Sequence, residues 1–331
     1  MVSLFKDKTT TGVFRLILLS VVVHIRFFIH SPMVVLPEDN LLLAPLLNNL
    51  SVLPTLVLAM IYHGIVVIQA LRLNYILGNY KLFPHSNFTV AMCYILFTGL
   101  IPSWCNITAA LVINILIIWL IHLLCQLYHS TKPGASVINI GLVAGSAGLL
   151  YPPSFLLILI ILLGVLIIRP FRFTLVITYI IGVTIPLYFL GTYLFLHDML
   201  PGIGQYLPKI SIHQPSQSEN KGTFIASLSL IGICLISGFS YLQAGMHKLL
   251  ILARKTWIIL MIMVVLFLPA IFLLNNQLWP ILLLTMPAAA ALSGNLFYYN
   301  QKKILLSVIF WLFIFASWFF SFNGWELIIK K

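Results

Sequence analysis

The sequence predicts an all-α protein, a polytopic transmembrane helix bundle of about eleven spans that forms a single integral membrane domain over residues 1–331. Composition supports this, because 61% of the residues are hydrophobic and only 7% are charged, against about 25% charged in an ordinary soluble domain. The apolar residues also fall into runs close to the roughly 20 residues that a helix needs to cross a bilayer. A water-soluble globule is therefore excluded.

The stretch from Tyr151 to Arg172 shows how one span is delimited. The two prolines after Tyr151 lack backbone donors and suit the start of a helix. Apolar residues then continue to Ile168, and Arg169 and Arg172 follow. Arginines are costly in hydrocarbon and usually mark the cytoplasmic face. This stretch therefore predicts a span that begins near Pro153 and ends on the inner side.

The same criteria define the other spans. In chain order, the eleven predicted spans are 12–28, 50–71, 88–101, 107–127, 137–150, 153–168, 173–196, 224–243, 257–274, 278–296 and 304–321. The third, fifth and sixth are short, and we expect them to be tilted or paired inside the bundle. The connection over residues 72–87 mixes basic and aromatic residues, which predicts a segment in the lipid interface.

The positions of the basic residues predict the orientation, with the amino terminus in the cytoplasm. The cytoplasmic face then carries Lys6, Lys8, Arg15, Arg72, Lys81, Lys132, Arg169, Arg172, Lys248, Arg254, Lys255, Lys302 and Lys303, and the outer face Arg26, Lys209, Lys221, Lys330 and Lys331. The net charge of +12 thus reflects topology, and no nucleic-acid partner is predicted. All acidic residues except Asp7 fall on the outer side, a bias that insertion does not explain.

Two outer loops, at about 30–49 and 197–222, are long enough to hold a site. In the first, Glu38 or Asp39 could act as a general base towards an acceptor hydroxyl. The alternative is a solvated loop in which Asp39 caps a short interfacial helix. Both interpretations stay open at this stage.

Arg26 lies near the outer end of the first span, between His24 and His30. A guanidinium matches the geometry of a phosphate, which favours a polyprenyl phosphate or a phospholipid as its ligand. Lys209 and Lys221, in the second outer loop, are candidates for holding the same phosphate. The alternatives are that Arg26 snorkels to the interface or pairs with a carboxylate of the first loop.

His197 and Asp198 are a further polar pair on the outer face, suited to acid–base chemistry or to a cation. No third ligand has suitable spacing, so no metal is predicted, and no cofactor is predicted either. Gly141, Gly145 and Gly148 share one face of the fifth span and predict close helix packing. The four cysteines have no CxxC or Cys/His spacing and are predicted to be buried small hydrophobic residues.

The chain resembles an uncharacterised family of multi-pass inner-membrane proteins of Bacteroidota. The resemblance covers about the first 200 residues and is carried by residues 4–6, the Asn74 region ahead of 82–87, 97–102, 151–153 and 168–171. More distantly, the chain is similar to the C-type, polyprenyl-phosphate-dependent glycosyltransferases. Those enzymes have an inside amino terminus, about eleven or more spans, and an acidic residue in the first outer loop, where Glu38 and Asp39 stand here.

These observations predict a protein of the bacterial inner membrane that handles a polyprenyl-phosphate-linked sugar or a related glycolipid at the outer leaflet. Glu38 or Asp39 would deprotonate the acceptor, and Arg26 with Lys209 or Lys221 would hold the phosphate. One alternative is a non-enzymatic membrane subunit that scaffolds a cell-envelope assembly through a membrane-protein partner. Another is a lipid flippase or carrier, but span centres carry no Asp, Glu or Lys to couple ions.

Overall fold

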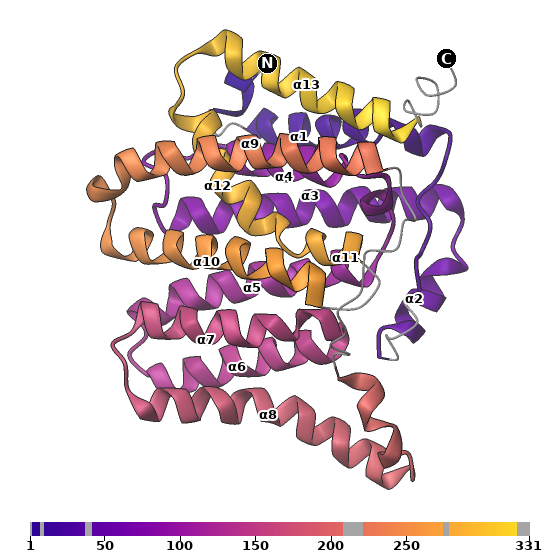
Figure 1. The fold of residues 1–331 in the computed structure, drawn as a ribbon, viewed down its shortest axis with the longest axis vertical. Helices are drawn as coiled ribbons and strands as arrows, with labels where there is room; N and C mark the ends of the chain where they lie inside the picture. Colours follow the sequence, from indigo (N-terminus) through magenta and orange to yellow (C-terminus); the bar gives the residue numbers. More distant parts are fainter. Residues whose placement is uncertain (1, 7–9, 37–41, 208–220, 274–277, 323–331) are drawn as a thin grey trace.

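The computed structural model describes residues 2–6, 10–36, 42–207, 221–273 and 278–322. Within these residues each predicted apolar run is helical (Figure 1). The α-helices are α1 (Thr10–Val23), α2 (Ala44–Ser51), α3 (Thr55–Asn79), α4 (Thr89–Thr98), α5 (Ala109–His129), α6 (Pro133–Leu150), α7 (Leu156–Ile168), α8 (Phe173–Leu196), α9 (Lys221–Gly245), α10 (Ile251–Leu273), α11 (Leu278–Leu283), α12 (Met286–Tyr299) and α13 (Lys303–Ser321).

Short 3₁₀ helices occupy several of the connections. They are η1 (Val2–Phe5), η2 (Ile25–Phe28), η3 (Pro102–Cys105), η4 (Pro152–Phe155), η5 (Leu200–Tyr206) and η6 (Met246–Lys248). The start predicted near Pro153 is confirmed, because η4 leads directly into α7. The described residues contain one β-bridge, a parallel pairing of Val34 with Ile107.

Seven helices in the described part of the chain are long and apolar enough to cross a membrane, namely α3, α5, α6, α8, α9 with η6, α10 and α13. The protein is therefore a multi-pass helical membrane protein, with fewer full-length spans than the eleven predicted. The runs at 12–28, 88–101 and 153–168 form shorter helices. The run at 278–296 is divided between α11 and α12, because Pro287 cannot donate a backbone hydrogen bond within a continuous helix.

Two boundaries differ from the prediction for local reasons. Residues 72–79 extend α3 instead of forming an interfacial loop, because Leu73, Ile76 and Leu77 are buried and Asn74 donates to the backbone oxygen of Asn87 at 2.6 Å. The fifth span starts at residue 133, where a proline is a favourable first helical residue, so α6 is long enough to cross.

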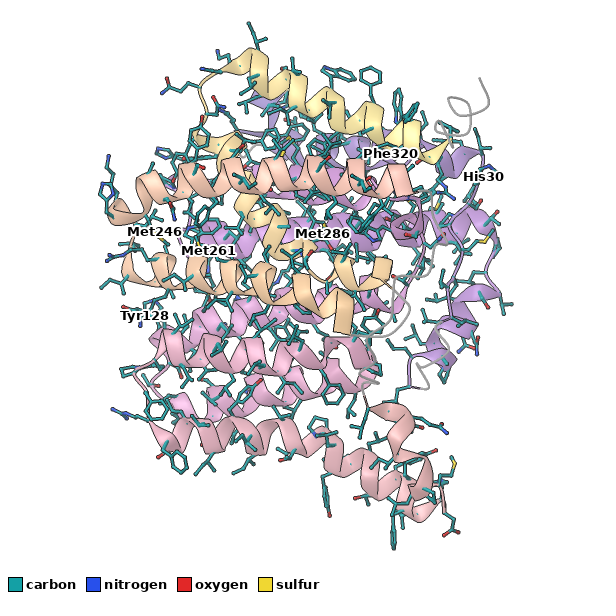
Figure 2. The ribbon with its side chains drawn as sticks, in the orientation of Figure 1. His30, Tyr128, Met246, Met261, Met286 and Phe320 are labelled. Atoms are coloured by element: carbon teal, nitrogen blue, oxygen red, sulfur yellow. The ribbon has the colours of Figure 1, made fainter. Side chains whose placement is uncertain are left out.

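The long helices lie side by side with alternating direction, so the bundle has two ends (Figure 1). His30 marks one end and Tyr128 the other (Figure 2). We call them the His30 end and the Tyr128 end. The Tyr128 end contains several basic side chains that bind backbone oxygens of neighbouring elements: Lys6 contacts Tyr298 and Asn300, Arg169 contacts Leu127 and Ser130, and Lys255 contacts Ile168. Which end faces the cytoplasm stays a prediction.

The predicted small-residue packing is confirmed and involves α6 and α8. A Cβ atom at Gly141 would lie 2.5 Å from the backbone oxygen of Tyr179, and one at Gly145 would lie 2.7 Å from that of Val183. On the facing helix, a Cβ at Gly182 would lie 2.6 Å from the backbone oxygen of Ile138. The backbones of α6 and α8 are in direct contact, so α8 already covers this face of α6. The face is therefore not available to a partner protein.

The four cysteines, Cys93, Cys105, Cys125 and Cys234, are all buried with free thiols, as predicted. The main core joins α1, α3, α4, α5, α9, α10, α12 and α13, and a second core joins α5–α8 with α10. Polar groups within these cores are candidates for a functional site, since a polar side chain inside a membrane bundle is costly unless it is hydrogen-bonded or binds a ligand.

Candidate functional site

The candidate site lies at the His30 end, where the first loop packs against the connection between α4 and α5. The backbone nitrogen of Ile107 donates to the oxygen of Met33, and that of Val35 donates to the oxygen of Ile107. The side chain of Asn106 accepts a further bond from the backbone nitrogen of Met33 at 3.1 Å. The loop is therefore attached, before it reaches residue 37, to the residues that follow η3.

Beneath this loop, a buried polar cluster joins α1 to α3. His24 Nδ1 lies 2.9 Å from the backbone oxygen of Ser20, and His24 Nε2 lies 3.2 Å from the hydroxyl of Tyr62. That hydroxyl also lies 3.0 Å from the backbone oxygen of Trp104, and Ser20 Oγ lies 2.8 Å from Nδ1 of His63. His24 and Tyr62 are almost completely buried. The cluster fixes the end of α1 against α3 and η3.

The hydrogen bonds of this cluster show which ring nitrogen of His24 carries a proton. A backbone oxygen can only accept, so Nδ1 of His24 carries a proton and donates it to Ser20. In a neutral imidazole, Nε2 is then an acceptor, and the single hydroxyl proton of Tyr62 serves either Nε2 or the oxygen of Trp104. Because His24 is almost completely buried, the neutral imidazole with its proton on Nδ1 is the favoured form, and the hydroxyl of Tyr62 donates to the oxygen of Trp104.

Arg26 lies in η2, one turn beyond this cluster, and is partly buried. Its Nη1 donates to the backbone oxygen of Pro102 at 3.4 Å, a long hydrogen bond. A guanidinium has five N–H donors, and no carboxylate among the described residues pairs with this one. Arg26 is therefore held against η3 with most of its donors available.

The other predicted site residues do not contact Arg26 through their side chains in the described part of the chain. Glu38, Asp39 and Lys209 lie outside the described residues, so their predicted roles stay predictions. Lys221 is the first residue of α9. His30 is exposed at the end of the bundle, and its backbone nitrogen donates to the oxygen of Arg26.

His197 and Asp198 lie at the carboxyl end of α8, and both are exposed. The imidazole of His197 lies over the ring of Tyr193, with ring centroids 4.3 Å apart, and its Nδ1 contacts the oxygen of Tyr193 at 2.9 Å. Asp198 has a φ of 55° and terminates the helix. Helix α8 packs on α6 and α7, and α1 packs on α3, α4 and α13, so the structure does not bring this pair to Arg26 (Figure 1).

A second buried network lies deeper in the bundle and was not predicted. Gln69 donates to the backbone oxygen of Leu111 and accepts from the hydroxyl of Tyr94, both at 2.6 Å. Asn114 donates to the oxygen of Leu283 at 3.0 Å. The sequence did indicate that Gln69 faces the interior, because it lies seven residues after Tyr62 and two polar residues at this spacing share one face of a helix.

His63 and Ser20 were missed as members of the site for a different reason. Their contact joins residues 43 positions apart, and no spacing within one helix indicates it. Among the described residues, no group of three His, Cys, Asp or Glu side chains lies close enough to hold a metal ion.

Comparison with known proteins adds no family to this picture: no family model, curated protein or solved structure matches the chain. The fold and the site together define a multi-pass helical membrane protein with a buried polar cluster and an arginine at one end of the bundle.

Proposed function

We propose that the protein binds the phosphate of a polyprenyl-phosphate-linked sugar, or of a related glycolipid, at the His30 end, and transfers the sugar to an acceptor. In this proposal Arg26 is the principal phosphate ligand, with Lys209 or Lys221 as a second cation. Glu38 or Asp39 is the base. The His30 end would then face the outer leaflet of a bacterial inner membrane.

The observation that carries the proposal is the state of Arg26. Arg26 is partly buried, yet among the described residues its guanidinium makes one hydrogen bond, a long one to the oxygen of Pro102. A charge near the membrane boundary is costly when it has no counter-charge. A lipid phosphate would offer several acceptor oxygens to the remaining donors, and the planar guanidinium can bind two of these oxygens at once.

The surroundings of Arg26 support binding at a fixed position. The cluster of His24, Tyr62 and the oxygen of Trp104 holds the end of α1 in place. The first loop, which carries Glu38 and Asp39 in sequence, is paired with residues 106–107 through Met33 and Val35. Arg26 and the base of this loop thus contact the same connection between α4 and α5, Arg26 at Pro102 and the loop at Asn106 and Ile107.

The proposed chemistry is a glycosyl transfer that balances without a cofactor. The acceptor hydroxyl oxygen forms a bond to the anomeric carbon of the sugar, and the bond from that carbon to the phosphate oxygen breaks. The hydroxyl proton passes to the carboxylate of Glu38 or Asp39. The leaving polyprenyl phosphate keeps the electron pair, and Arg26 stabilises the charge that develops on it.

The test is mass spectrometry of polyprenyl-linked lipids from cells that lack the protein, complemented with the wild type or with variants. We expect a sugar-charged carrier to accumulate in the deletion and to persist with Arg26→Ala or with the Glu38→Gln, Asp39→Asn double variant. Arg15→Ala is the matched control, because Arg15 lies in α1, the helix that precedes η2, and its Nη1 also donates to one backbone oxygen, that of Leu4 at 3.0 Å.

Each variant must first be shown to insert at wild-type abundance. If the lipid pool does not change in the deletion, or if inserted Arg26→Ala and the double variant both clear the carrier, the transferase proposal is wrong. A non-enzymatic membrane subunit would then be the better description, and its partner should co-purify at fixed stoichiometry.

A further inference from the structure

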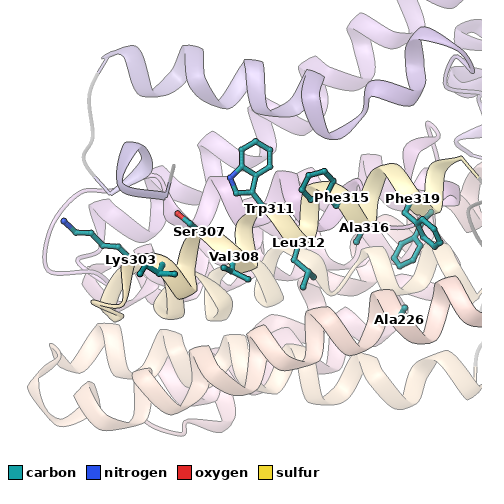
Figure 3. A pocket seen from close by; sticks show the side chains of 11 residues that line it. Ala226, Lys303, Ser307, Val308, Trp311, Leu312, Phe315, Ala316 and Phe319 are labelled. Atoms are coloured by element: carbon teal, nitrogen blue, oxygen red, sulfur yellow. The ribbon is translucent and has the colours of Figure 1, made fainter.

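A long apolar groove follows α13 on its outer surface. It has a volume of about 1010 Å³ and is bounded by α13 and, on α9, by Ala226. Val308, Trp311, Leu312 and Phe315 line it and are exposed by 39–58%. Figure 3 shows Trp311 and Phe315 projecting from α13 on one side and Leu312 on the side towards α9.

One end of this groove is positively charged. Lys303 lines it there, and Ser307 stands one turn further along α13 (Figure 3). Lys302 precedes α13 and is exposed, as is Lys303. The rest of the lining is apolar. The groove therefore has a positively charged end with a hydroxyl group and an otherwise apolar lining. These features complement the anionic headgroup and the acyl chain of a lipid.

A third ammonium group lies close to this end. The rings of Phe5 and Phe310 are 6.3 Å apart, so η1 packs against the first half of α13 and brings Lys6 near Lys303. Burial, together with the positive charge of Lys303, lowers the pKa of Lys6 below its usual value. Of the six acidic residues in the chain, only Asp198 lies in the described part, and it terminates α8. The described residues therefore supply no carboxylate to these lysines.

The two lysines are also in a poor position for the helix itself. Lys302 and Lys303 stand at the amino end of α13, and its first turn has no acidic residue. Positive charges at a helix amino terminus oppose the helix dipole and are unfavourable there. Membrane topology alone accounts for basic residues at this end of the bundle, but it does not account for their place at the mouth of a groove.

We propose that this groove binds a phospholipid with an anionic headgroup, whose phosphate contacts Lys303 and Lys302 and whose acyl chain lies along Val308, Trp311 and Leu312. The site is at the Tyr128 end and is independent of the function proposed for Arg26. The lining runs along α13 from Lys303 to Phe320. Half of a roughly 30 Å hydrocarbon core is about 15 Å, so the first ten or so helical residues after Lys303 cover one leaflet.

The position of Trp311 provides the assay. Full-length protein is placed in vesicles of neutral phosphatidylcholine that contain a small share of phosphatidylglycerol with brominated chains, and quenching of tryptophan fluorescence is measured. The contribution of Trp311 is the difference between wild type and Trp311→Phe. Trp119 serves as the control, because it is 47% exposed on α5 and does not line the groove. The difference in quenching between wild type and Trp119→Phe measures ordinary contact with bulk lipid.

We expect Trp311 to be quenched preferentially by brominated phosphatidylglycerol, with an apparent local enrichment of up to about thirtyfold over brominated phosphatidylcholine, since each of the two lysines attracts anionic lipid by about 1 kcal/mol and about 1.4 kcal/mol corresponds to tenfold. Trp119 should show no such preference. The Lys302→Gln, Lys303→Gln double variant should remove the preference at Trp311. Lys248→Gln, an exposed lysine in η6 outside the groove lining, should retain it.

A second variant tests the groove separately from the charge. Val308→Phe narrows the groove one turn before Trp311 and keeps both lysines, and it should reduce the preferential quenching. If Trp311 shows no preference for the anionic lipid, or if the double lysine variant keeps the preference, the headgroup site is wrong. If Val308→Phe leaves the preference intact, the acyl chain does not lie in this groove.

Discussion

The contact between α6 and α8 provides a sharp test of the fold. Replacing Gly141 or Gly145 with alanine should destabilise the protein, because the new methyl group meets backbone rather than a movable side chain. The methyl carbon would lie 2.5 Å from the oxygen of Tyr179 in the first variant and 2.7 Å from that of Val183 in the second. Backbone atoms of two packed helices cannot move aside independently, so the helices must separate.

The size of the effect follows from these distances. Ordinary contact for a Cβ atom begins at 3.4 Å, so the backbones must separate locally by about 0.7–0.9 Å. Overpacking of this kind typically costs about 1–3 kcal/mol. Alanine in a helix interior recovers roughly 0.5–1 kcal/mol relative to glycine. We therefore expect each variant to lower the free energy of unfolding by roughly 1 kcal/mol, and by at most about 2.5 kcal/mol.

The measurement is unfolding in mixed micelles, followed by far-ultraviolet circular dichroism as the denaturing detergent is increased. Gly191→Ala is the matched control, because Gly191 lies on α8 and a Cβ there meets nothing within 4 Å. This control should be neutral or slightly stabilising. If Gly141→Ala and Gly145→Ala unfold like Gly191→Ala, the close approach of α6 and α8 is incorrect and the small-residue face is again open to a partner.

Three further predictions test buried polar contacts by the same unfolding measurement. Ser317→Ala removes a hydroxyl that lies 2.8 Å from the backbone oxygens of both Val23 and Gly99, and it should cost about 0.6–1.7 kcal/mol. Gln69→Leu leaves the buried hydroxyl of Tyr94 without its acceptor and should cost about 1–3 kcal/mol. Adding Tyr94→Phe should recover part of that loss. Equal stability of the single and double variants would contradict the hydrogen bond between Gln69 and Tyr94. Arg169→Lys loses the planar fork that reaches Leu127 and Ser130 and should cost about 1 kcal/mol, whereas Arg172→Lys, at an exposed position, should be neutral.

Much of the helical content could be predicted from the sequence because it depends on local properties. Apolar runs must form helices in a bilayer, where each backbone donor needs a partner within its own segment. Prolines and charged residues then delimit the runs, as the η4–α7 start at Pro152 and the end at Arg169 show. The prediction was less accurate where packing decides the boundary, as at Arg72, which lies within α3.

The candidate site was predicted only in part. Arg26 stood out because it is the one arginine that the predicted orientation assigns to the outer face. Its partner at Pro102 lies 76 positions away, and no sequence pattern connects the two. The predicted roles of Glu38 and Asp39 remain predictions that the lipid measurement tests.

The sequence by itself determined that the chain is a multi-pass helical membrane protein, since that follows from how many apolar residues stand together and where the charges interrupt them. Only the tertiary structure decided which side chains meet. The hydroxyl of Tyr62 contacts His24, Gly141 packs on the backbone of α8, and α13 packs beside α9, where Ala226 and residues of α13 line one groove. Each of these contacts joins different helices, and helices in lipid associate through shape and a few hydrogen bonds that no single-helix periodicity contains.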